Sequence, residues 1–163
     1  MQTLTIIIAD DHPLFRGALK QAVQGLSTDL TIIEAGDFNA ARAAAQTHRD
    51  ADLLLLDLAM PGVSGFSGLM SLRAEFSGLP IVVVSATDDG ATIRRSLELG
   101  ASGFISKSSG LDDIRTGIYA VLDGDIWAPE GHVPMSDEEP GISELLERLR
   151  TLTPQQSRVL NML

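Results

Sequence analysis

The chain has 163 residues, no cysteine, and 22 acidic against 12 basic side chains, which gives a formal net charge of −10. This charge disfavours nucleic-acid binding through bulk electrostatics, and the lack of cysteine excludes disulfides, thiolate zinc sites and a cysteine nucleophile. No apolar run approaches the roughly 18 residues of a membrane span, and the first residues lack the pattern of a signal peptide, so we expect a cytoplasmic protein without a membrane partner.

The first third of the chain predicts two strands and two helices in alternation. Residues 4–9 form a β-branched apolar run, typical of a buried strand. Pro13 suits the first position of the helix that follows, because its missing N–H has no partner there in any case. Residues 30–35 predict a second strand, and Asp37 can cap an alanine-rich helix that reaches about residue 48.

Residues 53–57 predict the central strand of the fold. Its four consecutive leucines suit a strand that is covered on both faces, as in a parallel sheet. Asp57 stands at the carboxyl end of this strand, and Met60-Pro61-Gly62 then predicts a turn.

The second half continues the alternation. Strands are predicted at residues 80–85 and 103–105, with a helix between them that Gly100 can end. The last helix is expected to be capped by Ser109 and stopped by Gly124. The helix before the fourth strand is marked by four apolar residues: Phe66, Leu69, Met70 and Phe76.

Five β–α units in about 120 residues predict an α/β fold of the flavodoxin-like (βα)5 class. We expect a parallel five-stranded sheet of order 2-1-3-4-5, with right-handed crossovers and helices on both faces. In such sheets ligands bind at the carboxyl ends of the strands, here in a crevice beside strands one and three.

Polar side chains follow four of the predicted strands at this edge. Asp10 and Asp11 end the first, Asp57 the third and Ser85 the fourth, and Lys107 follows the fifth. Three carboxylates at close range repel one another unless a cation lies among them, and an oxygen-only donor set suits Mg²⁺. Aspartate is also a known phosphoryl-accepting nucleophile, and Mg²⁺ with a lysine can neutralise a transferring phosphoryl group. The set therefore predicts phosphoryl acceptance.

Each of these residues alone has an ordinary explanation. Asp10 or Asp11 can cap the next helix, Ser85 can be a turn residue, Lys107 a solvated loop residue and Phe104 part of the core. Their joint occurrence at separate strand ends favours the functional interpretation.

Residues 4–122 resemble the receiver domain of two-component response regulators. The resemblance is carried by the segments IIIADDHPLFRGAL, LLLLDLAMPG, VVVSA and GASGFISK. The string DDHPLFRGAL and the tail LTPQQSRVLNML are similar to the LuxR-type (NarL/FixJ) subgroup of transcription regulators. The resemblance implies a signalling domain that catalyses only its own phosphoryl transfer and slow dephosphorylation, with a sensor histidine kinase as its partner.

The resemblance also implies the role of each acidic residue. Asp57 corresponds to the phospho-acceptor. Asp11, Asp57 and the backbone carbonyl of Ala59 correspond to the Mg²⁺ ligands, and Asp10 helps directly or through water.

Three further residues correspond to the family's switch. Ser85, in place of the commoner threonine, is the hydroxyl that moves onto the phosphoryl group, and Lys107 is its cationic partner. Phe104 is the rotating aromatic residue and stands where tyrosine is frequent. Phosphorylation is then expected to change the face formed by the fourth helix, fifth strand and fifth helix.

The chain after Gly124 differs in composition, with several prolines and glycines and an acidic run. We expect a receiver domain over residues 1–124, a linker with a short helix over 125–150, and the first helix of a truncated LuxR-type helix-turn-helix domain over 151–163. DNA would then be bound only through the part of that domain missing beyond Leu163. A homodimer remains an open alternative for the oligomeric state.

Three other functions compete with phosphoryl acceptance as interpretations of this sequence. A pseudo-receiver would act as an interaction module that ignores phosphate, but the acidic, hydroxyl and lysine set is complete. A phosphohydrolase often carries a second aspartate two residues after the nucleophile, and Ala59 occupies that position. A flavodoxin-like small-molecule binder would need a glycine-rich phosphate loop after the first strand, which the sequence lacks.

Overall fold

The computed structural model describes residues 3–26, 29–62 and 65–129, and within them five strands alternate with five helices. The strands are β1 (Thr3–Ala9), β2 (Asp29–Ala35), β3 (Leu53–Asp57), β4 (Ile81–Ser85) and β5 (Gly103–Ser106). The helices are α1 (Pro13–Val23), α2 (Phe38–Thr47), α3 (Ser67–Glu75), α4 (Gly90–Glu98) and α5 (Leu111–Leu122). None of these helices combines the length and hydropathy that a bilayer span requires.

The strands form one parallel sheet of order β2-β1-β3-β4-β5, which confirms the predicted flavodoxin-like topology. Every residue of the interior strands β3 and β4 and of the edge strand β5 is buried. Burial on both faces explains why these strands read as continuous apolar runs instead of alternating with polar residues.

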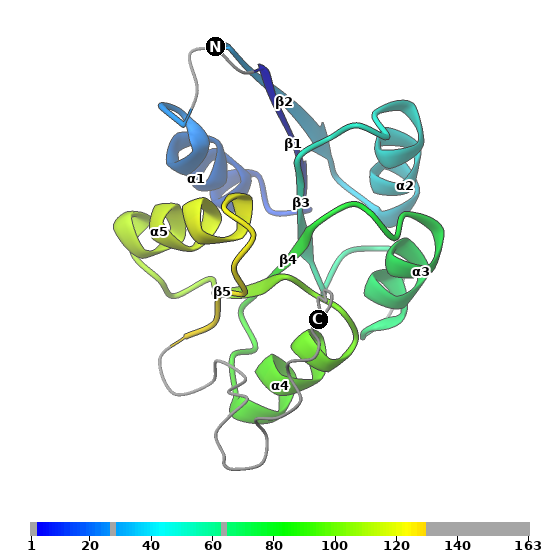
Figure 1. The fold of residues 1–163 in the computed structure, drawn as a ribbon. Helices are drawn as coiled ribbons and strands as arrows, with labels where there is room; N and C mark the ends of the chain where they lie inside the picture. Colours follow the sequence, from blue (N-terminus) through cyan, green and yellow to red (C-terminus); the bar gives the residue numbers. More distant parts are fainter. Residues whose placement is uncertain (1–2, 27–28, 63–64, 130–163) are drawn as a thin grey trace. The chain divides into compact units, whose positions relative to one another are not determined.

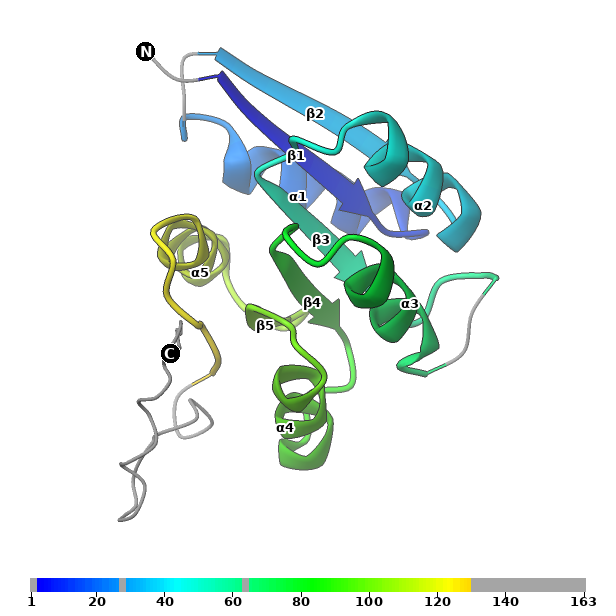
Figure 2. The ribbon, with the colours of Figure 1, turned by 45° about the vertical axis from the view of Figure 1, so that its right-hand side comes forward.

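Two hydrophobic cores lie on opposite faces of the sheet, because successive side chains of a strand point to opposite sides. In β3, Leu54 and Leu56 belong to one core, whereas Leu53 and Leu55 belong to the other. Helices α2, α3 and α4 contribute to the first core, and α1 and α5 to the second. Figures 1 and 2 show this layered arrangement, with α1 and α5 together on one side of the strands.

The four apolar residues predicted to mark the third helix lie in α3 or at its ends, whereas the predicted cap of the last helix is wrong. Met70 is 51% exposed, because α3 packs through Leu69 and Leu72, which lie on the side of the helix that faces the sheet. Ser109 does not cap α5: its N–H donates to the carbonyl of Ser106, and Gly110 is the N-cap residue.

The predicted helix stops at Gly100 and Gly124 are confirmed. Both residues have positive φ, at 104° and 95°, a conformation that glycine adopts without steric cost. A Cβ atom at Gly100 would also lie 2.9 Å from Nε of Arg73, so this position has little space for a side chain.

Residues 125–129 lie along the outer edge of β5. The Trp127 N–H donates to the Ser102 carbonyl at 3.1 Å, and the Trp127 carbonyl accepts from the N–H of Phe104 at 2.9 Å. The indole packs over Gly117 of α5, where a Cβ atom would lie 2.6 Å from its Nε1. The rest of the predicted linker and the predicted C-terminal helices lie outside the described residues, so these boundaries remain predictions.

Candidate functional site

The sheet brings the predicted polar residues together at its carboxyl edge. Ala9 pairs with Leu56 between β1 and β3, so Asp10 and Asp57 follow at the same level of adjacent strands. Asp57 pairs in turn with Val84, one residue before Ser85. Ser85 pairs with Ser106, which directly precedes Lys107. Register alone therefore places these four residues next to one another along the carboxyl edge of the sheet.

The three carboxylates form one cluster. Asp10 and Asp57 are buried, with 0% and 1% of the residue exposed, and 29% of the Asp11 side chain is exposed. One oxygen of each carboxylate lies within 4.8 Å of the others and of a ring nitrogen of His12. Among the described residues, Asp10 Oδ2 and Asp11 Oδ1 are buried but have no hydrogen-bond partner.

Lys107 supplies a positive charge to this cluster. Its Nζ donates a hydrogen bond of 3.1 Å to Asp57 Oδ2 and lies 3.0 Å from Asp10 Oδ2. The same Nζ lies 5.1 Å from the centre of the Phe15 ring, close enough for a cation–π contact. Phe15 thus helps to hold the lysine over the carboxylates, although the sequence indicated it only as part of the apolar stripe of α1.

Backbone amides orient two of the carboxylates. Asp57 Oδ1 accepts from the N–H of Ala59 at 3.0 Å, and Asp10 Oδ1 accepts from the N–H of His12 at 2.7 Å. Both bonds close the turn that follows a strand, so the carboxylate direction is set by the local backbone. The predicted ligand role of the Ala59 carbonyl remains a prediction.

His12 is a site residue that sequence reasoning missed. Its Nδ1 lies 3.1 Å from Asp10 Oδ1, 3.1 Å from Asp11 Oδ1 and 3.4 Å from Asp57 Oδ2. Lys107 Nζ lies 2.9 Å from the same nitrogen. Its position directly after two aspartates could have indicated a site residue, because a side chain at the start of α1 can turn back toward the strand ends.

Of the other two predicted switch residues, Ser85 lines the same pocket as Asp57, and Phe104 lies in a hydrophobic core. Ser85 is 4% exposed, and its Oγ accepts from the N–H of Thr87 at 3.0 Å. Phe104 is fully buried, in the core between the sheet and α2, α3 and α4. Ser106 Oγ donates to Asp88 Oδ2 at 2.7 Å, which joins the loop after β4 to the loop after β5.

Arg16 anchors the acidic loop from the side of α1. Its Nη1 donates to the backbone carbonyl of Asp10 at 2.6 Å, and its Nε lies 2.8 Å from Glu34 Oε1. Glu34 also accepts from Lys20 Nζ at 3.0 Å. The Lys20 hydrogen bond, with that of Arg16, lowers the pKa of Glu34, so Glu34 stays ionised and holds Arg16 in place.

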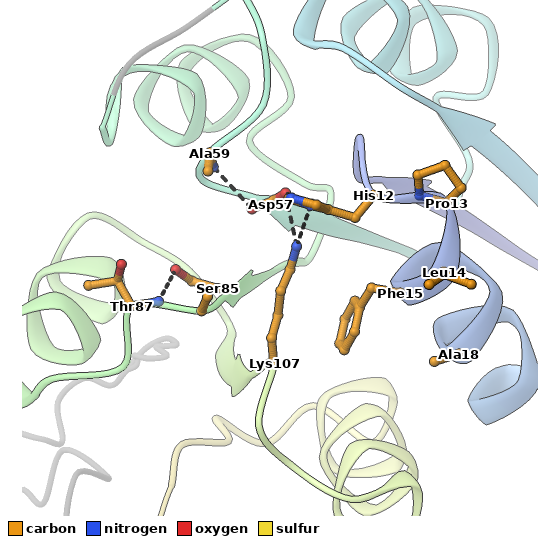
Figure 3. A pocket seen from close by; sticks show the side chains of 11 residues that line it. His12, Pro13, Leu14, Phe15, Ala18, Asp57, Ala59, Ser85, Thr87 and Lys107 are labelled. Atoms are coloured by element: carbon orange, nitrogen blue, oxygen red, sulfur yellow. Dashed lines mark hydrogen bonds and ion pairs between the residues drawn. The ribbon is translucent and has the colours of Figure 1, made fainter.

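Asp57 and His12 of the cluster line a pocket of about 620 Å³ (Figure 3). Asp57, Ser85, Thr87 and Lys107 line its polar side. The opposite side is formed by apolar residues of α1 and its start: Pro13, Leu14, Phe15 and Ala18. A buried aspartate is therefore accessible to a molecule that enters from one direction.

The donor set fits a hard divalent cation. Three carboxylates converge, and two of their buried oxygens make no hydrogen bond among the described residues, although Lys107 Nζ lies 3.0 Å from Asp10 Oδ2 and His12 Nδ1 lies 3.1 Å from Asp11 Oδ1. One lysine offsets only part of the charge of three carboxylates, so the cluster can accept a further cation. Oxygen ligands with remaining positions for water are the preference of Mg²⁺. Asp10, Asp11 and Asp57 can therefore hold such an ion.

Comparison with known proteins gives a consistent result for the family. Residues 6–119 match the family described as "Response regulator receiver domain". The chain is 40% identical over 124 residues to the glycerol metabolism activator of Pseudomonas putida, covering 76% of this chain and 56% of that protein. It is 31% identical over 132 residues to the nitrate/nitrite response regulator protein NarL of Escherichia coli, covering 80% and 60%. The chain thus spans less than two-thirds of the length of these curated relatives.

Solved structures are similar over the same region. The signal receiver domain of NarL from Mycobacterium tuberculosis has a TM-score of 0.67 at 30% identity, covering 76% of this chain and 99% of that one. The isolated REC domain of RcsB from Salmonella enterica serovar Typhimurium, solved with the phosphomimetic BeF3−, has a TM-score of 0.71 at 25% identity, covering 79% and 95%.

Proposed function

The chain belongs to the response regulator receiver domain family, in its NarL/LuxR branch, and on that premise we propose that it accepts a phosphoryl group on Asp57 from a sensor histidine kinase. The observation that carries the proposal is a nearly fully buried aspartate that faces an open pocket and is paired with Lys107 at 3.1 Å. Burial removes competing water, and the lysine offsets negative charge where a phosphoryl group would arrive.

Phosphoryl transfer needs a nucleophile, a donor and a leaving group in line. A carboxylate oxygen of Asp57 attacks the phosphorus atom of the kinase's phosphohistidine. The O–P bond forms as the P–N bond breaks, and the electron pair of that bond returns to the imidazole nitrogen, which takes up a proton. The product is an aspartyl phosphate, which adds about −1.5 to −2 charge near neutral pH.

Mg²⁺ is the cofactor of this proposal, held by Asp10, Asp11, Asp57 and the carbonyl of Ala59. When bound, it supplies positive charge to the oxygens of the transferring group. The protein's own part is to hold the ligands still: the Ala59 N–H fixes Asp57, and the His12 N–H fixes Asp10. Lys107 Nζ lies 3.1 Å from Asp57 Oδ2, beside the place where the phosphoryl group would arrive.

Signalling would result from a rearrangement of the loops after β4 and β5, where Ser85 and Lys107 lie. The Ser85 hydroxyl accepts from the N–H of Thr87 and, among the described residues, keeps its own O–H free, so a rotation of the side chain would let it donate to a phosphoryl oxygen on Asp57. Phe104 then repacks, and the face of α4, β5 and α5 changes its binding surface. This is a two-state switch whose populations phosphorylation shifts.

The donor's approach is consistent with the shape of the pocket. Leu14 is 93% exposed at its apolar rim, next to the opening over Asp57. We assign this rim to the docking of the kinase. Transcription regulation through DNA is a proposal for the whole protein alone, since one relative, NarL of Mycobacterium tuberculosis, is described as a transcriptional regulatory protein.

A pseudo-receiver is the alternative function. It predicts that the site is an inert remnant, whereas Asp57, Lys107 and Ser85 all retain positions around one pocket. A phosphohydrolase is disfavoured because Ala59 places a methyl group where a second acid or base would act.

The test is intact mass after incubation with a small-molecule phosphodonor and Mg²⁺. The parent chain should gain one phosphoryl group, the Asp57→Ala variant none, and the Asp112→Ala variant, altered at a fully exposed carboxylate of α5, the same as the parent. Equal labelling of Asp57→Ala would remove Asp57 as the acceptor. No labelling of the parent by the donor or by any histidine kinase would favour the pseudo-receiver.

A further inference from the structure

The ring of His12 lies among the three carboxylates. Its Nδ1 is within 3.1–3.4 Å of an oxygen from each of Asp10, Asp11 and Asp57. Four potential ligand atoms, three oxygens and one nitrogen, lie within 4.8 Å of one another. The nitrogen therefore takes up part of the space that an ion bridging these oxygens needs.

The ring enters the cluster from solvent. The His12 side chain is 58% exposed, whereas the carboxylates of Asp10 and Asp57 are 1% exposed. Its backbone is fixed at the start of α1, where the N–H donates to Asp10 Oδ1. Rotation of the side chain alone can thus move the ring out of the cluster without any change in the backbone.

Nδ1 has two alternative contacts in the cluster, and the tautomer decides which of them holds the ring: with its proton Nδ1 donates to a carboxylate, and without it Nδ1 accepts from Lys107. Nδ1 lies beside the Asp10 and Asp11 oxygens, and Lys107 Nζ approaches it at 2.9 Å. A nitrogen in this place has different consequences for different ions. Mg²⁺ prefers oxygen ligands, whereas imidazole is a preferred ligand of ions such as Ni²⁺ and Zn²⁺.

We propose that His12 determines the metal selectivity of the site. The ring has to leave the cluster before Mg²⁺ binds, and it stays as a nitrogen ligand when an imidazole-preferring ion such as Ni²⁺ binds. This inference rests on the proposed function, because it concerns the same carboxylates, but it makes a separate statement about a residue that the metal-dependent reaction does not require.

The proposal predicts opposite effects of one substitution on two ions. In His12→Ala the competitor for Mg²⁺ is gone, so the Mg²⁺ dissociation constant should fall about threefold or more, as expected when the binding-competent state becomes fully populated. The same variant loses a ligand for Ni²⁺, so the Ni²⁺ dissociation constant should rise about tenfold or more.

The measurement is isothermal titration calorimetry of Mg²⁺ and Ni²⁺ on the full chain without a polyhistidine tag. The parent is compared with His12→Ala and with the matched control His48→Ala, which removes a histidine at the end of α2. A ratio of Ni²⁺ to Mg²⁺ affinity that falls in His12→Ala and not in His48→Ala supports the proposal. Affinities that stay unchanged, or that change in the same direction for both ions, overturn it.

A second measurement does not depend on a variant. In the parent labelled with ¹³C-histidine, paramagnetic Ni²⁺ should broaden the His12 ring signals beyond detection and leave those of His48 sharp, whereas Mg²⁺ should shift the His12 signals without broadening. Sharp His12 signals in saturating Ni²⁺ would overturn the proposal. Phosphorylation of the parent in Mg²⁺ with an unchanged metal ratio in His12→Ala would overturn this inference and leave the proposed function standing, whereas no Mg²⁺ binding by either protein would refute both.

Discussion

The guanidinium of Arg16 donates a hydrogen bond of 2.6 Å to the backbone carbonyl of Asp10, and so ties the acidic loop to α1. Arg16→Met keeps the length of the side chain but removes this charged donor. A lost hydrogen bond from a charged group costs about 1.5–3 kcal/mol, and supporting residues around metal ligands are typically worth a 10- to 100-fold change in metal affinity. We expect Mg²⁺ affinity to fall about tenfold, measured by calorimetry.

Lys20→Met is the matched control for this prediction. Lys20 shares the partner Glu34 with Arg16, but among the described residues it makes no hydrogen bond or ion pair with Asp10. Its Mg²⁺ affinity should therefore match that of the parent. Equal losses in the two variants would mean that the ion pairs with Glu34 matter, and not the bond to the Asp10 carbonyl.

Glu34 should give the protein a small dependence of stability on acid pH. The Lys20 hydrogen bond lowers the pKa of Glu34 in the folded state, so ionised Glu34 stabilises the fold above the ordinary pKa of a glutamate. This contribution is lost as the pH falls through the lowered value. Since the side chain is 40% exposed, it should be under about 1 kcal/mol.

Urea denaturation of the parent and of Glu34→Gln at two pH values tests this. The variant should be less stable at about pH 7 and should approach the parent as the pH falls below the lowered pKa of Glu34 in the folded state, where the side chain is protonated in both states. A difference that persists unchanged at the lower pH would show that charge on Glu34 is not its cause.

Asp11 should link metal binding to thermal stability. Mg²⁺ at about 100 times its dissociation constant stabilises a protein by about 2.7 kcal/mol, so the melting temperature of the parent should rise. Asp11→Ala removes a buried oxygen that has no hydrogen bond in the described structure, and it should show no such rise. Without Mg²⁺ the variant should be at least as stable as the parent, because one of three mutually repelling carboxylates is gone.

Scanning calorimetry with and without Mg²⁺ checks both statements about Asp11. Asp112→Ala serves as the control, since its carboxylate is fully exposed on α5 and is not part of the carboxylate cluster. A normal Mg²⁺-dependent rise in Asp11→Ala would contradict the ligand assignment.

Two glycines in helices should respond in opposite ways to alanine. In Gly17→Ala, no described atom lies within 4 Å of the new Cβ, so the gain in helix propensity of about 0.5–1 kcal/mol should stabilise α1. In Gly117→Ala the Cβ would lie 2.6 Å from Trp127 Nε1 and 2.7 Å from Cδ1, so the indole has to move. Overpacking of this kind costs about 1–3 kcal/mol, more than the helix gains.

Urea denaturation followed by circular dichroism gives both values in one experiment. Stabilisation of similar size in the two alanine variants would show that Trp127 does not pack on α5 in solution.

Much of the fold followed from the sequence because its strands are long apolar runs with one plausible topology. The leucines of β3 and the valines of β4 must be covered on both faces, and short connections with right-handed crossovers leave few arrangements. Once the strand order is known, register places Asp10, Asp57 and Ser85 at one edge without further information.

Side-chain directions were beyond the reach of these patterns. The spacing of apolar residues did not show that Met70 faces solvent, because an exposed apolar residue next to Leu69 extends the apolar pattern of the helix without being buried. His12 and Arg16 depend on where α1 begins and on side-chain rotations about that point, which decide whether each reaches the strand ends. The sequence therefore predicted the carboxylates of the site and missed two residues that surround them.

The packing of Trp127 has a practical consequence. It is the single tryptophan of the chain, and its carbonyl accepts a hydrogen bond from the N–H of Phe104, the proposed rotating residue. Its indole lies against α5, and its backbone pairs with β5. The protein thus carries a natural fluorophore attached to two of the three elements of the proposed switching face, and its emission can report a rearrangement there without any added label.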